Sequence, residues 1–368
     1  MANIILPPWL RNSATNRLES DYIGGWQSGK VPSLTNITGT WTDGATVYIN
    51  GSNFSSYNSI GQTFFTDFTQ DTVGGRASGF NYWSTVGAEY SVNNTDIPPI
   101  GSRCITAHPI QEQIKPSVYQ FATPQNEVYL EAWVRVNKVD FTSSPDAPQI
   151  KMFRITDGTG ESSMQGRPLT SDITFESDGS LQAYSNPVVG IGAWFNSGSP
   201  QYSPTWNKFV MYLRKGDLNT ANGERFIKFG NIEIFTHSSI PSGHYASPTG
   251  IVSATEYAGE GIITHNSTTA AYQLQRVAMP YFQREQQESI IDISHIYINN
   301  SRERVVIGNA PTWAACDKTK AYTVPASSRA DNRIIIKAYT STQIPGSLYA
   351  YVWNHDGYYN PNGLLVRA

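Results

Sequence analysis

The stretch that decides the fold is residues 127–136, EVYLEAWVRV, in which apolar and polar side chains alternate. Successive side chains of a strand point to opposite faces, so this alternation predicts a β-strand with one buried face and one solvent face. The predicted buried face holds Val128, Leu130, Ala132, Val134 and Val136, and the predicted solvent face holds Tyr129, Glu131, Trp133 and Arg135.

Strand patterns continue on both sides of this segment. Residues 205–216, TWNKFVMYLRKG, place Phe209, Met211 and Leu213 on one face and Lys208, Val210, Tyr212 and Arg214 on the other. Residues 172–185 and 224–235 are predicted hairpins, because Asp-Gly and Gly-Asn stand at their turns. Further strands are predicted at 149–155, 289–308, 334–338, 348–353 and 364–366, and residues 268–277 fit a strand or a short helical turn.

The composition agrees with an all-β chain. Charged residues make up 15% of the 368 residues, below the usual value of about 25%, while aromatic residues reach 12%. The net charge is −3 without any basic run, so a nucleic-acid partner is not expected. No stretch is apolar enough to predict membrane insertion. The two cysteines, Cys104 and Cys316, show no metal or redox spacing and are predicted to be free, buried thiols.

The segment TWNKFVMYLRKGDLNTANGERFIKFGN, residues 205–231, resembles a pattern of concanavalin-A-like jelly rolls, the architecture of lectins, glucanases and polysaccharide lyases. Residues 294–313 are similar to the closing strand of that family, and residues 64–92 resemble its opening strand and turn. The resemblance implies a jelly-roll sandwich over residues 61–308, in which one face of each strand packs between two sheets.

The remaining strands fall into two incomplete pieces. Residues 31–54, VPSLTNITGTWTDGATVYINGSNF, open like a small β-sandwich but lack its later strands, which residues 309–368 supply. Together they resemble an IPT/TIG immunoglobulin-like domain, whose opening pattern is matched by Pro32, Gly39, Gly44, Val47, Ile49, Gly51 and Phe54. We therefore expect the jelly roll to be inserted in a discontinuous domain of residues 31–60 and 309–368. The alternative is a separate hairpin with an independent C-terminal cap.

Residues 1–30 have no strand or helix periodicity but contain Trp9, Leu10 and Trp26. Large apolar side chains are costly to leave in water, so this segment is predicted to be an arm that docks on a partner subunit. The alternative is a flexible tail.

No complete catalytic motif is present. Jelly-roll lyases use a Tyr or His base, with Arg and an amide to neutralise the uronate, and Arg135, Arg154, Tyr212, Arg214 and His108 are available for these roles. The alginate-lyase and glucanase motifs of the family are absent, which favours a protein that is not an enzyme. No metal-ligand spacing occurs among the histidines, so no cofactor is predicted, although Asp157, Asp178 and Asp217 could hold calcium in loops.

The predicted solvent faces of two strands suggest a carbohydrate-binding site. It comprises Tyr129, Glu131, Trp133, Arg135, Lys208, Tyr212 and Arg214. Aromatic rings stack on sugars and charged groups bind hydroxyls or uronates. The alternative is that this face packs on a second layer of protein.

Two functions of different classes follow. The first is a non-enzymatic virion structural protein (capsid decoration, head fibre or tail-associated), because the arm and the immunoglobulin-like stem resemble phage decoration and fibre proteins. It would form a homo-oligomer, contact other virion subunits and host-surface glycans, and assemble in the host cytoplasm without a signal sequence. The second is a secreted polysaccharide lyase or another carbohydrate-active enzyme of the jelly-roll fold.

Overall fold

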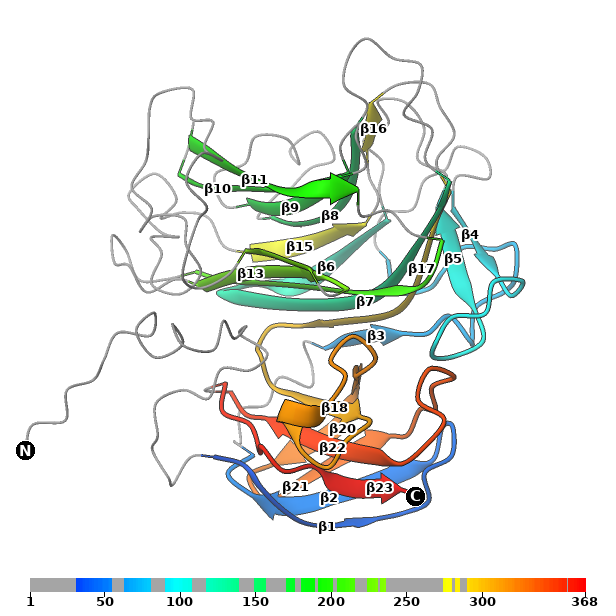
Figure 1. Ribbon diagram of the computed structural model, residues 1–368, viewed down its shortest axis with the longest axis vertical. Helices are drawn as coiled ribbons and strands as arrows, with labels where there is room; N and C mark the ends of the chain where they lie inside the picture. The colour runs from blue at the N-terminus through cyan, green and yellow to red at the C-terminus, as the bar shows by residue number, and fades with distance from the viewer. Residues whose placement is uncertain are drawn as a thin grey trace, which may run out of the picture.

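A computed structural model describes residues 31–54, 63–80, 90–107, 117–138, 149–156, 170–175, 180–188, 191–200, 204–215, 224–230, 232–235, 274–279, 282–284, 290–355 and 357–368. These residues form antiparallel sheets and one short 3₁₀ turn, η5 (Trp313–Ala315). The all-β fold class predicted from the sequence is confirmed. The strands group into two stacked sandwiches, which we call the large and the small sandwich (Figure 1).

One sheet of the large sandwich lies next to the small sandwich, and we call it the junction sheet (Figure 1). In spatial order it contains β14 (Ile232–Phe235), β13 (Glu224–Phe229), β12 (Asn207–Arg214), β7 (Glu127–Lys138), β17 (Ile290–Asn299), β5 (Cys104–Ala107) and β4 (Tyr90–Asn93), and β3 (Phe64–Thr66) also pairs with β17.

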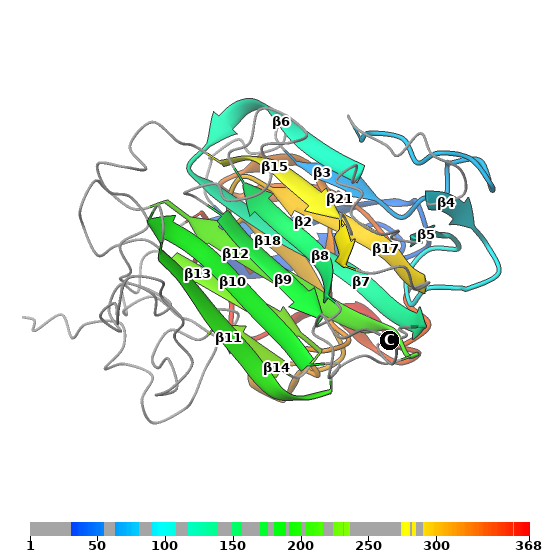
Figure 2. The same cartoon turned by 90° about the horizontal axis from the view of Figure 1, so that it is seen from above.

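The other sheet of the large sandwich lies farther from the small sandwich, and we call it the distal sheet (Figures 1 and 2). Its order is β11 (Ile191–Pro200), β10 (Ser180–Val188), β9 (Thr170–Phe175), β8 (Gln149–Thr156), β15 (Leu274–Met279) and β6 (Ser117–Gln125), with β16 (Phe282–Arg284) paired to β8. Residues 274–279 are thus a strand, which resolves the ambiguity left by the sequence.

The core of the large sandwich lies between these two sheets. Phe153 of β8 stacks on Phe209 of β12, with ring centroids 4.4 Å apart. The predicted apolar faces are confirmed, because the buried cluster contains Val128, Leu130, Ala132, Val134, Val136, Phe209, Met211 and Leu213. The alternation in β7 therefore predicted correctly which face of the strand packs in the core.

The small sandwich is built from the two ends of the described chain (Figure 1). One sheet has the order β1 (Ser33–Thr38), β2 (Thr46–Ser52), β21 (Arg333–Lys337) and β20 (Ala326–Ala330). The other has the order β19 (Tyr322–Val324), β18 (Arg304–Gly308), β22 (Leu348–Trp353) and β23 (Leu364–Arg367). Both sheets contribute to one buried cluster, which includes Val47, Ile49, Val305, Ile336 and Val352.

Pairing between β2 and β21 joins segments that are almost 300 residues apart. Val47 is opposite Ile336 and Ile49 is opposite Ile334. Gly39, between β1 and β2, has a φ of 112°, and a Cβ there would lie 2.7 Å from the Thr46 carbonyl oxygen, so this turn requires glycine. The pieces 31–54 and 321–368 thus share one sheet and one core, while the division of the chain into domains stays a prediction.

Strand β18 lies in the small sandwich, whereas the sequence predicted it to be part of the jelly roll. Residues 294–313 resemble the closing strand of a jelly roll, and the predicted boundary was residue 309. Instead, β18 pairs with β19 and β22 in the small sandwich. By its pairing, β18 is a strand of the small sandwich, and residues 300–303 connect it to β17.

Candidate functional site

The residues proposed to bind sugar lie where the two sandwiches meet, which we call the junction. Five of them, Tyr129, Glu131, Trp133, Lys208 and Tyr212, are at most 7% exposed. Their predicted solvent exposure is wrong, because the small sandwich covers this face of the junction sheet. Sugar binding by this set was predicted from that exposure and remains a prediction.

Three side chains of the junction sheet hold the outer edge of β19. The Glu131 carboxylate accepts hydrogen bonds from the Thr323 backbone nitrogen and hydroxyl, both at 2.8 Å. The Lys208 ammonium donates to the Ala321 carbonyl oxygen at 2.9 Å, and His295 Nε2 lies 2.7 Å from the Thr323 carbonyl oxygen. An edge strand presents unpaired backbone groups, and here side chains from another sheet satisfy three of them.

Two arginines of the small-sandwich side complete the junction. The Arg304 guanidinium lies between two rings, 4.6 Å from the Tyr129 centroid and 4.4 Å from the Trp353 centroid. The Arg302 guanidinium donates to the Tyr212 hydroxyl at 2.9 Å, and that hydroxyl donates to Glu127 at 2.6 Å. Burial raises the pKa of Tyr212 well above its ordinary value, so its hydroxyl stays protonated as a donor.

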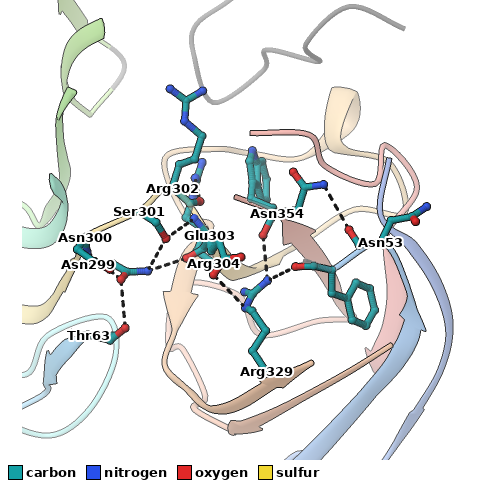
Figure 3. A network of polar contacts seen from close by, with 12 residues as sticks. Asn53, Thr63, Asn299, Asn300, Ser301, Arg302, Glu303, Arg304, Arg329 and Asn354 are labelled. Carbon is teal, nitrogen blue, oxygen red and sulfur yellow. Dashed lines mark hydrogen bonds and ion pairs between the residues drawn. The ribbon is translucent and has the colours of Figure 1, made fainter. Parts of the chain in front are cut away.

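The chain crosses from β17 to β18 through a buried polar segment (Figure 3). Asn299 Nδ2 donates to the Glu303 carbonyl oxygen at 2.9 Å, and the Thr63 hydroxyl donates to Asn299 Oδ1 at 3.2 Å. Arg329 forms an ion pair with Glu303 at 3.8 Å and donates to the Trp353 carbonyl oxygen. This crossing is held by hydrogen bonds from both sides rather than being a loose linker.

The two remaining members of the predicted set are half-buried. Arg135 forms ion pairs with Asp292 at 2.7 Å and Asp96 at 2.5 Å, and its guanidinium lies 5.3 Å from the Trp206 ring centroid. Arg214 lies at the last position of β12. Two carboxylates and an aromatic ring of the protein itself therefore hold Arg135 in place.

The outward face of the distal sheet carries a different group of polar residues. Phe153 and Ile155 belong to the core, so Arg154 between them faces away from it. On the neighbouring strand β15, Ala278 is opposite Arg154, and Arg276 lies two residues away on the same face. Gln120 of β6 is opposite Arg276 and is half-exposed. Gln120, Arg154 and Arg276 therefore form one group, which we call the distal polar group, and its two arginines are only 3% and 2% exposed.

The register of the distal sheet extends this group across further strands. Arg154 is opposite Asp172 on β9, Asp172 is opposite Tyr184 on β10, and Tyr184 is opposite Trp194 on β11. Residue types that contact sugars thus occupy one register row beside the distal polar group. The sequence named Arg154 but missed Gln120 and Arg276, because strand patterns do not tell which strands are neighbours.

Several predicted residues lie outside the described part of the chain. They are His108, the loop residues Asp157, Asp178 and Asp217, and the arm residues Trp9, Leu10 and Trp26. Among the residues that the structure describes, no group of three or more His, Cys, Asp or Glu is placed to hold a metal ion. No helix in the same residues is long and apolar enough to cross a membrane. Both cysteines are free and buried, as predicted.

Comparison with known proteins gives remote structural likenesses only. No protein-family model and no curated protein sequence matches the chain. The structure is similar to an endo-β-1,4-glucuronan lyase from the fungus Trichoderma reesei, at 12% identity and a TM-score of 0.40, over 64% of this chain and 94% of that one. It is also similar to the alginate lyase Aly36B, at 10% identity and a TM-score of 0.38, over 64% of this chain and 96% of that one.

A third similar structure is the cellulose-induced protein Cip1, at 14% identity and a TM-score of 0.38, over 65% of this chain and 97% of that one. TM-scores and identities this low do not assign a function to the chain.

Proposed function

We propose that the protein binds an anionic polysaccharide on the outward face of the distal sheet. The observation that carries this proposal is the distal polar group: Arg154, Arg276 and Gln120 on one face of three adjacent strands. Gln120 is half-exposed, whereas Arg154 and Arg276 are 3% and 2% exposed, so the proposal requires both guanidinium groups to become accessible when the polysaccharide binds.

The chemistry of the distal polar group suits a carboxylated sugar. Arginine binds carboxylates through two parallel hydrogen bonds, and the amide of glutamine can donate to a carboxylate or accept from a hydroxyl. Positions two residues apart on paired strands are close enough for both guanidinium groups to serve one stretch of polymer. Aromatic residues in the same register row, Tyr184 and Trp194, are of the type that stacks on sugar rings.

An enzyme that binds a uronate polymer at this site would cleave it by elimination. Neutralising the uronate carboxylate would make its α-proton easier to remove, and a Tyr or His would act as the base. Of the parts named from the sequence, Tyr212 is buried in the junction and Arg135 is held by two aspartates. Arg154 is the described member of that set on the distal sheet, and Tyr184 occupies its register row.

Affinity electrophoresis in gels that contain alginate, pectate or polyglucuronate tests the binding. We expect retardation of the wild-type chain that weakens in Arg276→Ala and Arg154→Ala. The matched control is Arg333→Ala, which removes the same charge from an exposed position on β21 of the small sandwich. Thermal unfolding of each variant identifies any loss that reflects misfolding, and Gln120→Ala, at a half-exposed site, supplies a milder variant. Absence of retardation in all three gels contradicts the proposal.

Ultraviolet absorbance separates binding from cleavage, because elimination creates a conjugated double bond. Retardation without an absorbance rise assigns a binding protein, whereas a rise that Arg154→Ala abolishes assigns a lyase. The role in a virion and the docking of residues 1–30 on a partner subunit remain predictions. Immunolabelling of purified particles tests the first, and light scattering of a chain that lacks residues 1–30 tests the second.

A further inference from the structure

The junction contains a buried histidine at an irregular point of strand β17. Between Ser294 and Tyr297 the register with β7 shifts, because three steps on β17 match two steps from Trp133 to Glu131. His295 occupies this bulge with a φ of 48°, a conformation that is uncommon for residues other than glycine. The bulge turns the His295 ring toward β19 of the small sandwich, where its Nε2 meets the Thr323 carbonyl oxygen.

The hydrogen bond to Thr323 fixes the tautomer of His295. A carbonyl oxygen only accepts, so Nε2 carries the hydrogen and Nδ1 is the unprotonated nitrogen of a neutral ring. Nδ1 is buried and has no hydrogen-bond partner among the described residues. A proton added at Nδ1 would therefore place a charged donor in a site that offers it no acceptor.

Three aromatic rings and three charged side chains are packed around His295. The rings of Phe65, Tyr322 and Tyr339 lie around it, with centroids 5.0, 6.0 and 6.4 Å away. The charged groups that face it are Glu131 on β7, Asp67 after β3 and Lys208 on β12. Burial is the largest effect and lowers the pKa of His295, and Lys208 lowers it further, whereas Glu131, the hydrogen bond to Thr323 and Asp67 raise it.

We propose that the junction is an acid-sensitive latch, in which protonation of His295 releases β19 from the junction sheet and frees the small sandwich from the large one. When the latch is closed, Glu131, Lys208 and His295 hold the edge of β19. When it opens, the His295 ring reaches water, where a proton on Nδ1 finds the acceptor that the closed junction does not provide.

Proton linkage determines in which direction pH shifts the opening equilibrium. The closed state binds fewer protons than the open state below the ordinary histidine pKa, so acid favours opening. A histidine with an ordinary pKa of about 6.5 gains about tenfold in its protonated-to-neutral ratio for each pH unit below that value. The opening equilibrium should therefore rise by up to about tenfold between about pH 7.5 and about pH 5.5.

Hydrogen exchange of the full chain tests the latch. The Thr323 amide donates to Glu131, so the exchange of a peptide that covers residues 321–324 reports the opening. After correction for intrinsic rates, we expect its protection to fall by up to about tenfold at about pH 5.5, while residues 209–213 of the large-sandwich core stay protected. An unchanged protection of residues 321–324 overturns the proposal.

The variant His295→Gln tests whether His295 or Glu131 causes the loss of protection in acid. His295→Gln keeps an N–H donor for the Thr323 carbonyl oxygen but does not titrate, so its protection should not depend on pH in this range. The matched control is His355→Gln in the small sandwich, which should keep the wild-type acid response. If His295→Gln loses protection in acid as the wild type does, another group such as Glu131 is responsible and the proposal is wrong.

A measurement on the unmodified protein covers the case in which His295→Gln does not fold. The imidazole resonances of His295 should report a neutral ring for as long as the Thr323 amide is protected. An imidazolium at His295 together with a fully protected Thr323 amide would show that the closed junction accepts the proton, and would overturn the latch.

Discussion

Glu131 of the large sandwich and Thr323 of the small sandwich are joined by two hydrogen bonds of 2.8 Å that end on the two oxygens of one carboxylate. The second of these oxygens also accepts from the Tyr129 hydroxyl at 3.0 Å. A buried carboxylate with three donors is well satisfied, and it also lies near the buried ammonium of Lys208. Glu131 is therefore a structural anchor of the junction.

Glu131→Ala should lower the free energy of unfolding by roughly 3–5 kcal/mol, because it leaves buried donors and the Lys208 charge without their partner. Glu131→Gln should cost less, since the amide oxygen still accepts from one Thr323 donor. Urea unfolding of both variants measures the difference. A loss of less than about 0.5 kcal/mol for Glu131→Ala, the scale of surface substitutions, would contradict the anchor role.

Leu130, the neighbour of Glu131 on β7, tests the opposite face of the same strand. It is fully buried in the core of the large sandwich. Leu130→Ala should cost about 2–5 kcal/mol, the usual range for a buried leucine. Val73→Ala is the control, because Val73 is 44% exposed. Equal free energies of unfolding for these two variants would show that the assigned phase of β7 is wrong.

These two neighbours also show how far the sequence predicts the structure. Alternation assigned Leu130 to one face and Glu131 to the other correctly, because the pleat of a strand is a local property. The same pattern also predicted that Glu131 faces solvent, whereas in the structure Thr323 of the small sandwich covers it. What covers a face depends on how two sheets dock, and a strand pattern carries no information on that.

Long-range pairing was predictable only where a fragment was visibly incomplete. Residues 31–54 lacked late strands and residues 321–368 supplied them, so the partnership of β2 with β21 was accessible from the sequence. The distal polar group was not, because Gln120, Arg154 and Arg276 come from three separate strands of the chain. The same limit hid His295, whose role depends on a bulge and on β19.

A fragment experiment tests the discontinuous small sandwich. Residues 31–54 joined by a short linker to residues 304–368 contain every described strand of both small-sandwich sheets and should unfold cooperatively. Residues 309–368 alone lack β18, the central strand between β19 and β22, as well as Val47 and Ile49 of the shared core. They should remain unfolded, and dispersed amide signals from them would refute this assignment.

The last prediction concerns alkaline pH and the buried ammonium of Lys208. Its pKa is lowered to about 8, first by burial and then by the charges of Lys228 and Arg304, while Glu131 raises it. In the unfolded chain a lysine titrates near pH 10.4, so at intermediate pH the unfolded state binds about one more proton than the folded state. The free energy of unfolding contributed by Lys208 therefore rises with pH from about 8 to about 10.4, and is constant below that window.

Lys208→Met isolates this contribution, because buried tyrosines and cysteines titrate in the same range in both proteins. The difference in unfolding free energy, wild type minus Lys208→Met, should increase between about pH 8 and about pH 9.5 by roughly 1–2 kcal/mol. Lys337→Met is the control, since Lys337 is exposed on β21, and the same difference should be flat for it. A flat difference for Lys208→Met would mean that the folded protein keeps the ammonium charged, with Glu131 outweighing the cost of burial.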